Sequence, residues 1–366
     1  MNDTRPARAR AAAAAARRGG SALVLALVVV VVLSALLGSL AFEAKLEAGY
    51  ASLSRDRIKA SALAESGIEL AKMLMARSGG SQGAPDGVGE DEDRWNDAVE
   101  RLRAGQSLTG LVEPAGDGFV ILDIEPEPGR LNVNLLARED WETILENAGI
   151  PEEYLDYIVD PILDWMDEDD TPNSKGAETE DYYELLDPPY EARNGAFDTV
   201  RELLLVKGFT EPILTGGVWD PGTLRDDAGR SSSNPSFNRF SDTNAIVIAG
   251  IEGMLTTYGD GKINIQSAPY DVLRTLPGVD DILARAIMEE RDSVDENGDP
   301  NPFKSADDLF ARVDGLDSAV ASRITTSSSF FRITATGRVG LVERQIWCVA
   351  TVDGPNLRFL RWCEEP

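Results

Sequence analysis

The sequence predicts an α+β fold, in which one long N-terminal helix carries an antiparallel sheet and a helical domain is inserted between the strands of that sheet. Three observations lead to this prediction. An apolar run from Ser21 to Phe42 continues into helix-forming residues that reach Arg77 without a proline. Residues typical of strands gather at 119–134 and again at 331–362. Two helical segments with the same order of elements lie between these strand regions.

The apolar run is long enough to cross a membrane. No charged residue lies between Arg18 and Glu43, and Ala22 to Phe42 covers 21 residues. As a helix this segment is about 31 Å long, which matches a hydrocarbon core of about 30 Å. A basic arm precedes it and holds a single acidic residue, so the amino terminus is expected in the cytoplasm and the rest of the chain on the other side. The basic residues of the arm are Arg5, Arg8, Arg10, Arg17 and Arg18.

The helix is expected to continue out of the membrane. A cleaved secretory signal would be followed by a break and a new fold, and no such break appears. Instead, apolar residues recur at helical spacing, first at Leu46, Tyr50 and Leu53 and again from Leu63 to Leu74. The sequence therefore predicts one rod that starts in lipid and runs on for about nine turns in solvent.

Composition favours a partner-binding protein over an enzyme. The chain has 366 residues, with 63 acidic and 35 basic side chains and a formal charge of -28, and such a surface repels nucleic acid and suits divalent cations or basic partners. It contains no histidine, which excludes a His-dependent triad and a His-ligated zinc site. A carboxylate pair such as Asp164 and Asp167 could in principle serve acid–base chemistry on glycans, but no second catalytic motif accompanies it. We expect no enzymatic activity.

Beyond the long helix, the chain alternates loops with short elements. Residues 79–93 form a glycine-rich and acidic loop, and Arg94–Leu102 has the pattern of a short helix. Phe119–Ile124 and Arg130–Asn134 are predicted to be strands. The tail predicts three further strands, which would complete the sheet that starts near residue 119. These strands are predicted at Phe331–Arg338, Val342–Val352 and Leu357–Trp362.

The middle of the chain holds a loose internal repeat. Arg130–Asn134 and Lys262–Gln266 each precede a series of short helices interrupted by an acidic loop. Leu255–Ile265 is predicted to form a hairpin across Tyr258-Gly-Asp-Gly. The stretch Leu273–Arg291 fits a helix-hairpin-helix of a SAM-like domain, and its expected core residues are Leu273, Leu276, Val279, Leu283 and Ile287.

That hairpin raises a competing function, a membrane-anchored DNA receptor of the competence type. Two features argue against it. The turn reads Gly278-Val279-Asp280, with a carboxylate where a second glycine would let a phosphate approach. Residues 262–323 contain 7 basic and 13 acidic residues, whereas phosphate binding depends on Lys and Arg. We therefore expect the hairpin to serve packing and the protein to bind no nucleic acid.

The junction before the apolar helix resembles the processing site of type IV pilin-like subunits. Two arginines and Gly19-Gly20 precede Ser21, as in a site for prepilin peptidase. The resemblance implies cleavage between Gly20 and Ser21, with the methylation usual for such subunits. The fifth residue of the mature chain is Leu25, where most pilins have a glutamate that pairs with the subunit ahead. An unpaired carboxylate in lipid costs about 3 kcal/mol or more, so its absence suits a subunit at the tip of a fibre.

Three longer stretches resemble the minor pseudopilin K family of type II secretion. They are Ala62–Ala71 (ALAESGIELA), Asp164–Phe209 and Lys262–Ile287. The resemblance implies a structural subunit at the tip of the periplasmic pseudopilus, anchored in the inner membrane, that assembles with minor pseudopilins I and J. Other pseudopilins, the inner-membrane secretion platform and prepilin peptidase are further expected partners.

The predicted domain organisation follows from these assignments. A helical domain is inserted in a pilin-like α/β domain that lies behind a leader and the long helix. The expected segments are a leader at 1–20, the transmembrane and extended helix at 21–78, the first part of the α/β domain at 79–135, the helical insertion at 136–325 and the closing strands at 326–366.

An acidic loop within the insertion is a candidate calcium site. Its carboxylates would repel one another unless they are solvated or neutralised, and hard oxygen ligands in a flexible loop suit Ca²⁺. Counted as an EF-hand loop from Asp167, the twelfth position is Glu178 but the sixth is Pro172 instead of glycine. A solvated helix end remains the alternative on spacing alone, and the family resemblance favours a structural Ca²⁺ site. The candidate ligands are Asp164, Asp167, Asp169, Asp170, Glu178 and Asp181.

Two further sites are weaker candidates. Asp295, Asn297 and Asp299 alternate in a second acidic loop that could hold a metal or simply lie at the surface. Cys348 and Cys363 fall on the last two predicted strands, where a four-residue connection would place them opposite each other, and a periplasmic compartment would oxidise them. A slip of one residue in register would separate the two thiols.

Overall fold

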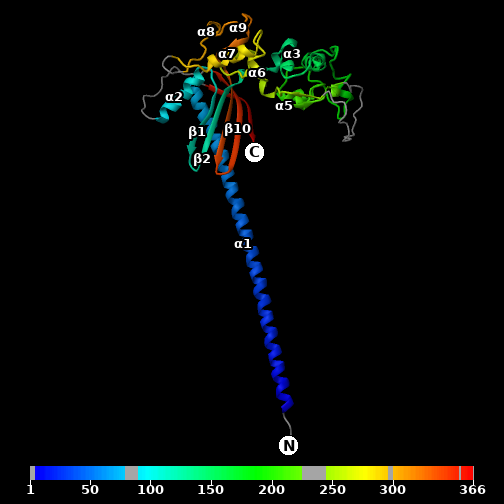
Figure 1. The fold of residues 1–366 in the computed structure, drawn as a ribbon, viewed down its shortest axis with the longest axis vertical. Coiled ribbons are helices and arrows are strands. Elements are labelled where there is room, and N and C mark those ends of the chain that lie inside the picture. Colours follow the sequence, from blue (N-terminus) through cyan, green and yellow to red (C-terminus); the bar gives the residue numbers. More distant parts are fainter. Residues whose placement is uncertain (1–4, 79–89, 225–244, 296–299, 354–355, 366) are drawn as a thin grey trace.

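The structure, a computed structural model, describes residues 5–78, 90–224, 245–295, 300–353 and 356–365. Helix α1 (Arg5–Ser78) is one uninterrupted rod, and the folded head lies at the end far from the amino terminus (Figure 1). Among the described residues, one helix is long and apolar enough to cross a membrane, from Leu23 onward, and none of its most apolar window is buried in the head. The predicted continuous helix is confirmed.

The head is built on a five-stranded antiparallel sheet. Its strand order is β1-β2-β9-β10-β11, so β2, the last strand of the sheet before the insertion, pairs with β9, the first strand of the sheet after it. The three predicted C-terminal strands are confirmed, and β1 is an additional strand that the sequence analysis did not identify. The strands are β1 (Leu108–Ala115), β2 (Gly118–Pro126), β9 (Phe330–Val339), β10 (Val342–Asp353) and β11 (Asn356–Glu365).

One face of the sheet packs against the far end of α1. Small and apolar residues of the helix are buried there, Ala64, Ile68 and Ala71 among them, against residues such as Ile333 and Cys348 of the sheet. A Cβ atom on Gly337 would overlap the backbone of Ala60 and Ala64, so glycine permits this close approach of helix and sheet. Helix α2 (Glu90–Arg103), predicted from 94 to 102, adds Ala98, Val99 and Leu102 to the same core.

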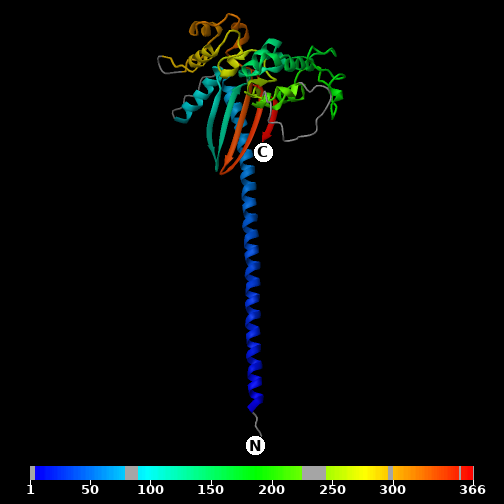
Figure 2. The same cartoon turned by 45° about the vertical axis from the view of Figure 1, so that its right-hand side comes forward.

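The insertion caps the end of the sheet, beyond the far end of α1, in both views (Figure 1 and Figure 2). Its first module closes around a core that contains Trp141, Ile158 and Trp219. The helices and strands of this module, in chain order, are η1 (Glu127–Gly129), β3 (Leu131–Asn132), η2 (Val133–Leu135), α3 (Arg138–Asn147), η3 (Glu152–Tyr154), α4 (Asp156–Met166), η4 (Tyr183–Leu185), η5 (Val200–Leu205), α5 (Glu211–Thr215), β4 (Gly217–Trp219), η6 (Pro221–Leu224), β5 (Ile246–Ile248), η7 (Glu252–Met254) and β6 (Leu255–Thr256).

The second module repeats this plan with fewer elements. Four of the five expected core residues of the predicted hairpin are buried, and Leu283 is partly buried against the same core. The module consists of β7 (Ile263–Asn264), α6 (Tyr270–Leu273), α7 (Asp281–Arg291), α8 (Ala306–Arg312), α9 (Val320–Arg323) and β8 (Ile324–Thr325).

The predicted hairpin at Leu255–Ile265 is wrong. Strand β6 pairs in parallel with β3, and β7 pairs in parallel with β8, so neither strand pairs with the other. Each module is thus closed by a short parallel pair between its first and last strands. This pairing depends on residues more than 60 positions away, which a local hairpin pattern cannot reveal.

Two asparagines occupy matching positions at the start of the modules. The Asn132 side chain accepts a hydrogen bond from the Asn134 amide at 3.1 Å and donates one to the Gly259 carbonyl at 2.9 Å. The Asn264 side chain accepts from the Gln266 amide at 3.0 Å and donates to the Gly105 carbonyl at 2.9 Å. The internal repeat seen in the sequence therefore extends to individual hydrogen bonds.

The expected disulfide is absent. Cys348 lies opposite Trp362 and Cys363 lies opposite Trp347, so the two thiols are one residue out of register on opposite faces of the sheet, and both are free. Asp353 and Asn356 are register partners, so two residues instead of four lie between the paired strands. An irregularity between Val349 and Ala350 then shifts the register by one residue toward the cysteines. Burial raises the pKa of Cys348 to about 12, as expected for an inert core thiol.

Candidate metal centre

The acidic loop begins at the C-terminal end of α4 and folds back over it. Asp164, in the last turn of that helix, has no solvent exposure, and Glu178, fourteen residues later, is 2% exposed. Around them Trp165, Tyr183 and Tyr190 pack edge to face or tilted, with ring centroids 5.1 to 6.3 Å apart. The aromatic cluster holds the loop against the core and keeps water from the two carboxylates.

Asp164 closes the loop. Its carboxylate accepts hydrogen bonds from the Asn173 amide at 3.1 Å and from the Ala177 amide at 2.7 Å. A Cβ atom on Gly176 would overlap the same carboxylate. Burial raises the pKa of Asp164 and the hydrogen bonds from Asn173 and Ala177 oppose that rise, with a further upward contribution from Asp160. Asp164 is therefore a structural group that organises the backbone of the loop.

Three other predicted ligands also have local hydrogen bonds. Asp169 accepts one from the Thr171 amide at 2.8 Å, and Asp181 accepts one from the Glu178 amide at 2.8 Å. Asp170 accepts one from the Asn194 side-chain amide at 3.3 Å. These bonds use one oxygen of each carboxylate and leave the other available to a cation.

Four other oxygens at this loop are buried and have no hydrogen-bond partner among the residues that the structure describes. They are both carboxylate oxygens of Glu178, one of Asp167 and the side-chain carbonyl oxygen of Asn194. Burial, followed by repulsion from Asp164, Asp167, Asp170 and Asp181, raises the pKa of Glu178 to about 7. Burial and the neighbouring Asp169 and Asp164 also raise the pKa of Asp167. Unpartnered buried acceptors of this kind are costly unless a proton or a cation satisfies them.

The oxygen atoms of the loop are of the kind that a hard cation binds, but the carboxylates are not arranged around one common point. In the part of the chain that the structure describes, no group of three His, Cys, Asp or Glu side chains is placed to hold one ion. Ca²⁺ accepts amide and backbone carbonyl oxygens as well as carboxylates, in flexible geometry. Asn194 is the functional candidate that the sequence analysis missed. It lies 24 residues from Asp170 in the sequence and has a positive φ of 47°. The only signal of this conformation in the sequence is the pair Asn194-Gly195.

The other predicted sites lie partly outside the described residues. Asn297 and Asp299 of the second candidate metal loop fall among residues 296–299, and only Asp295 is described. Gly20 and Ser21 lie within α1 as a continuous helix. Cleavage between them stays a prediction.

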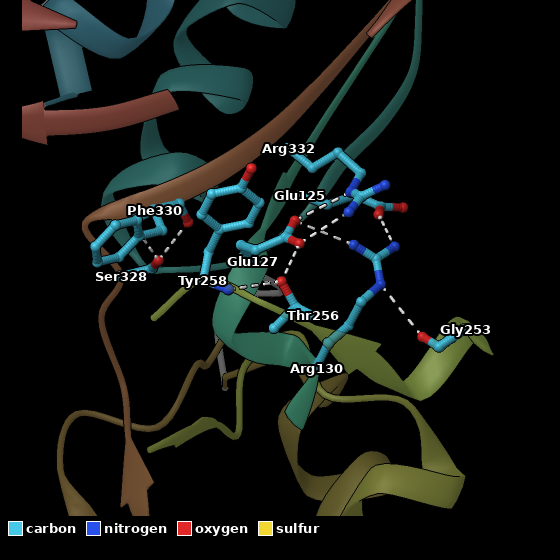
Figure 3. Close-up of polar contacts among 9 residues, drawn as sticks. All are labelled: Glu125, Glu127, Arg130, Gly253, Thr256, Tyr258, Ser328, Phe330 and Arg332. Atoms are coloured by element: carbon cyan, nitrogen blue, oxygen red, sulfur yellow. Dashed lines mark hydrogen bonds and ion pairs between the residues drawn. The ribbon is translucent and has the colours of Figure 1, made fainter. Parts of the chain in front are cut away.

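A second buried cluster, which the sequence analysis did not identify, joins the sheet to the insertion (Figure 3). The Glu127 carboxylate is fully buried and accepts hydrogen bonds from Arg332 of β9 at 2.9 and 3.0 Å and from the Thr256 hydroxyl at 2.6 Å. Arg130 adds a longer contact with Glu127 at 3.2 Å and pairs with Glu125 at 2.9 Å. Although burial alone would raise it, these partners hold the pKa of Glu127 below its usual range.

The fold is similar to that of a solved structure. An apolar rod carries an α+β head at its far end, and the same arrangement is found in a chain of known structure. The crystal structure of the GspK-GspI-GspJ complex of the type 2 secretion system of enterotoxigenic Escherichia coli matches with a TM-score of 0.53 and 13% identity, over 88% of this chain and 99% of the matched chain.

Sequence comparison finds similarity to one family over part of the chain. Residues 128–216 match the family model for type II secretion system protein K. Protein K of Pseudomonas aeruginosa is 31% identical over 99 residues, which cover 25% of this chain and 30% of that protein. The putative protein K of Escherichia coli K12 is 38% identical over 73 residues, 20% of this chain and 22% of that protein. The aligned segments thus span less than a third of each relative. The chain is thus similar to protein K of type II secretion over residues 128–216, the segment where the family model matches.

Proposed function

We propose that this protein is a minor pseudopilin at the tip of the type II secretion pseudopilus. In this role it assembles with minor pseudopilins I and J, helps to initiate the fibre and supports export across the outer membrane, without enzymatic activity. Prepilin peptidase, other pseudopilins and the inner-membrane secretion platform are the further partners of the proposal, and α1 is its single inner-membrane anchor with the head in the periplasm.

The observation that carries the proposal is the exposed part of α1 below the head. Leu46, Tyr50 and Leu53 lie on one side of the helix at helical spacing and are exposed there. No part of the described head covers this apolar stripe, and helices of neighbouring subunits would bury it. The crystal structure with the similar fold contains two partners, I and J, bound to protein K.

The end of the fibre is favoured by Leu25. A subunit inside the fibre would pair an intramembrane carboxylate with the subunit ahead, and this chain has an apolar side chain at that position. A subunit with none ahead of it needs no such carboxylate.

Co-expression with the I and J subunits tests the assembly. Leu53→Glu places a charge on the apolar stripe and is expected to reduce co-purification of the partners by at least tenfold. Ala51→Glu introduces the same charge about 160° away around the helix and serves as the matched control. Equal recovery of partners with both variants would contradict assembly through this stripe.

Leader removal is tested separately. Replacement of Gly20 by Trp is expected to block cleavage, seen as an unshifted band when prepilin peptidase is co-expressed. Gly49→Leu, in the same helix but outside the cleavage site, should be cleaved normally. Normal cleavage of the Gly20 variant would exclude the predicted site.

We also propose that the acidic loop binds a structural Ca²⁺. Its support is the set of buried oxygens without partners on Glu178, Asp167 and Asn194. A bound ion would satisfy these oxygens and link the end of α4 to the loop that follows. Tb³⁺ luminescence excited through Trp165 and Tyr183 should appear on titration and be displaced by Ca²⁺. Glu178→Gln should weaken Tb³⁺ binding at least tenfold, whereas Glu180→Gln, an exposed neighbour, should not.

The DNA-receptor alternative is disfavoured by Asp280. Its carboxylate accepts hydrogen bonds from the Ile282 amide at 3.0 Å and the Leu283 amide at 2.9 Å, and so occupies the end of α7 where a phosphate would bind. The protein is expected to show no salt-dependent retention of duplex DNA, and tight retention would favour the alternative.

A further inference from the structure

A groove of about 410 Å³ lies where the outer face of the sheet meets the insertion. Side chains alternate along a strand, so Ile333 and Cys348 face α1 while Arg332 and Trp347 face away from it. The insertion contributes the opposite wall of the groove through Arg201, Thr257 and Tyr258, among others. The groove is separate from the acidic loop and from the apolar stripe of α1.

Two arginines flank one indole ring in this groove. The guanidinium of Arg332 lies 5.0 Å from the ring centroid of Trp347, and that of Arg361 lies 5.2 Å from it. Both arginines are register partners of Val349, one on each neighbouring strand. Stacking on an aromatic face fixes the plane of a guanidinium and leaves its N–H edge free for a carboxylate.

The arginines of the groove differ in their partners. Arg130 and Arg332 bind Glu127, and Arg201 binds Glu252 at 2.9 Å (Figure 3 shows the first two). Arg361 has no carboxylate within ion-pair distance among the residues that the structure describes. Among the described residues it is therefore a positioned cation without an anionic partner, on a chain whose formal charge is -28.

The local charge balance limits what the groove can bind. Four arginines line it, and they contact three carboxylates, those of Glu125, Glu127 and Glu252. Counted over the described residues, one arginine charge has no carboxylate partner. A single carboxylate would balance this charge, whereas a polyphosphate or a nucleic acid would bring more negative charge than the groove can neutralise. The threonine and tyrosine hydroxyls beside it suit the main chain of a peptide.

We propose that this Arg-Trp groove, formed by Arg201, Arg332, Trp347 and Arg361 with Thr257 and Tyr258, is a docking site for an acidic side chain of another polypeptide. The incoming carboxylate binds the N–H edge of Arg361, and the peptide around it lies along Trp347. Because Glu127 and Trp347 already hold the arginines in place, little side-chain entropy is lost on binding.

Covalent capture tests the site even if a single carboxylate binds weakly. The full chain in detergent carries Arg361→Lys, and the peptide Gly-Ser-Glu-Gly-Ser-Asp-Gly-Ser, with a fluorescent dye blocking its amino terminus and an amide at its carboxyl terminus, is added with a carbodiimide. The reagent activates a peptide carboxyl, which forms an amide with a lysine amine in contact with it and releases a urea. Arg285→Lys, an exposed site on α7, is the matched control. Labelling at position 361 should exceed labelling at position 285 by at least tenfold, and the peptide with Gln and Asn should label neither.

A binding measurement completes the test. Anisotropy of the same peptide at low salt should show a preference of at least tenfold for the acidic form over the amide form. Arg361→Gln should abolish this preference with an unchanged melting temperature, and Arg285→Gln should retain it. Equal labelling at the two lysine positions, an undiminished preference in Arg361→Gln, or displacement of the peptide by pyrophosphate at lower concentration than by acidic peptide would overturn the proposal.

Discussion

Asp164 and Glu178 are both buried carboxylates of the acidic loop, but only Asp164 accepts hydrogen bonds from the backbone. The density of acidic residues led to the prediction of a metal site in this loop. Spacing could not separate the carboxylate that folds the loop from the one that lacks a partner, because that difference depends on which amides the backbone turns inward. Asn194 was missed for the same reason, since it reaches the loop from a separate segment.

The contact between Gly176 and Asp164 gives the first prediction. Gly176→Ala would push a methyl group into a carboxylate that is held by backbone amides, and overpacking of this kind costs about 1–3 kcal/mol. Urea unfolding should show that loss. Gly195→Ala, whose added Cβ would meet only ordinary van der Waals contact, is the control and should lie within about 0.5 kcal/mol of the parent protein. Equal stability of both variants would refute the proposed role of Asp164.

The raised pKa of Glu178 gives a pH dependence. A carboxyl whose pKa is about 7 in the folded state and near 4.5 when unfolded holds its proton more tightly in the folded protein. The contribution of this carboxyl to the free energy of unfolding is therefore fully present below about pH 4.5 and is lost as the pH rises to about 7. In chelator, the difference in melting temperature between the parent and Glu178→Gln should change over that range and level off above it. A constant difference from pH 4.5 to 8 would contradict the shift.

At the scale of elements, the long helix and the C-terminal strands could be predicted because their signals are local and long. Strand β1 was missed because Gly110 and Pro114 interrupt its pattern. The hairpin at Leu255–Ile265 was wrong because its two strands pair with distant partners. The prediction that Cys348 and Cys363 lie opposite each other was wrong because the connection between β10 and β11 is shorter than expected and their pairing contains an irregularity. Packing decides both features, and residue spacing in the sequence does not reveal them.

The contact between α1 and β9 is tight enough to test with one methyl group. Gly337→Ala would place a Cβ against the backbone of Ala60, which cannot move as a side chain can. We expect a loss of about 2–3 kcal/mol in the free energy of unfolding of the head. Gly49→Ala, on the exposed part of the same helix with nothing near its added Cβ, should not destabilise the protein. An undiminished stability of Gly337→Ala would show that the helix and sheet are less closely packed than described.

At the scale of the whole molecule, the Glu127 cluster joins parts of the chain that lie more than 200 residues apart. Glu127→Gln would remove the ion-pair partner of the partly buried Arg332, which costs at most about 3–5 kcal/mol, the range for breaking a fully buried pair. Protease should then cut more readily between the sheet and the insertion. Glu252→Gln breaks an exposed ion pair with Arg201 and should cost less than about 1 kcal/mol. The cluster would be unimportant for the junction if the two variants resisted protease equally.

The sheet also determines when the protein can fold. Pro126 and Phe331 are register partners, so the two ends of the insertion meet within one sheet. Closing a flexible loop of that length costs about 5 kcal/mol, and a prefolded insertion would reduce the cost by bringing its own ends together. Because β9, β10 and β11 follow the insertion in the chain, a chain that emerges amino terminus first cannot complete the sheet of its head until these three strands have emerged. A molecule that lacks these three strands would therefore lack a folded head.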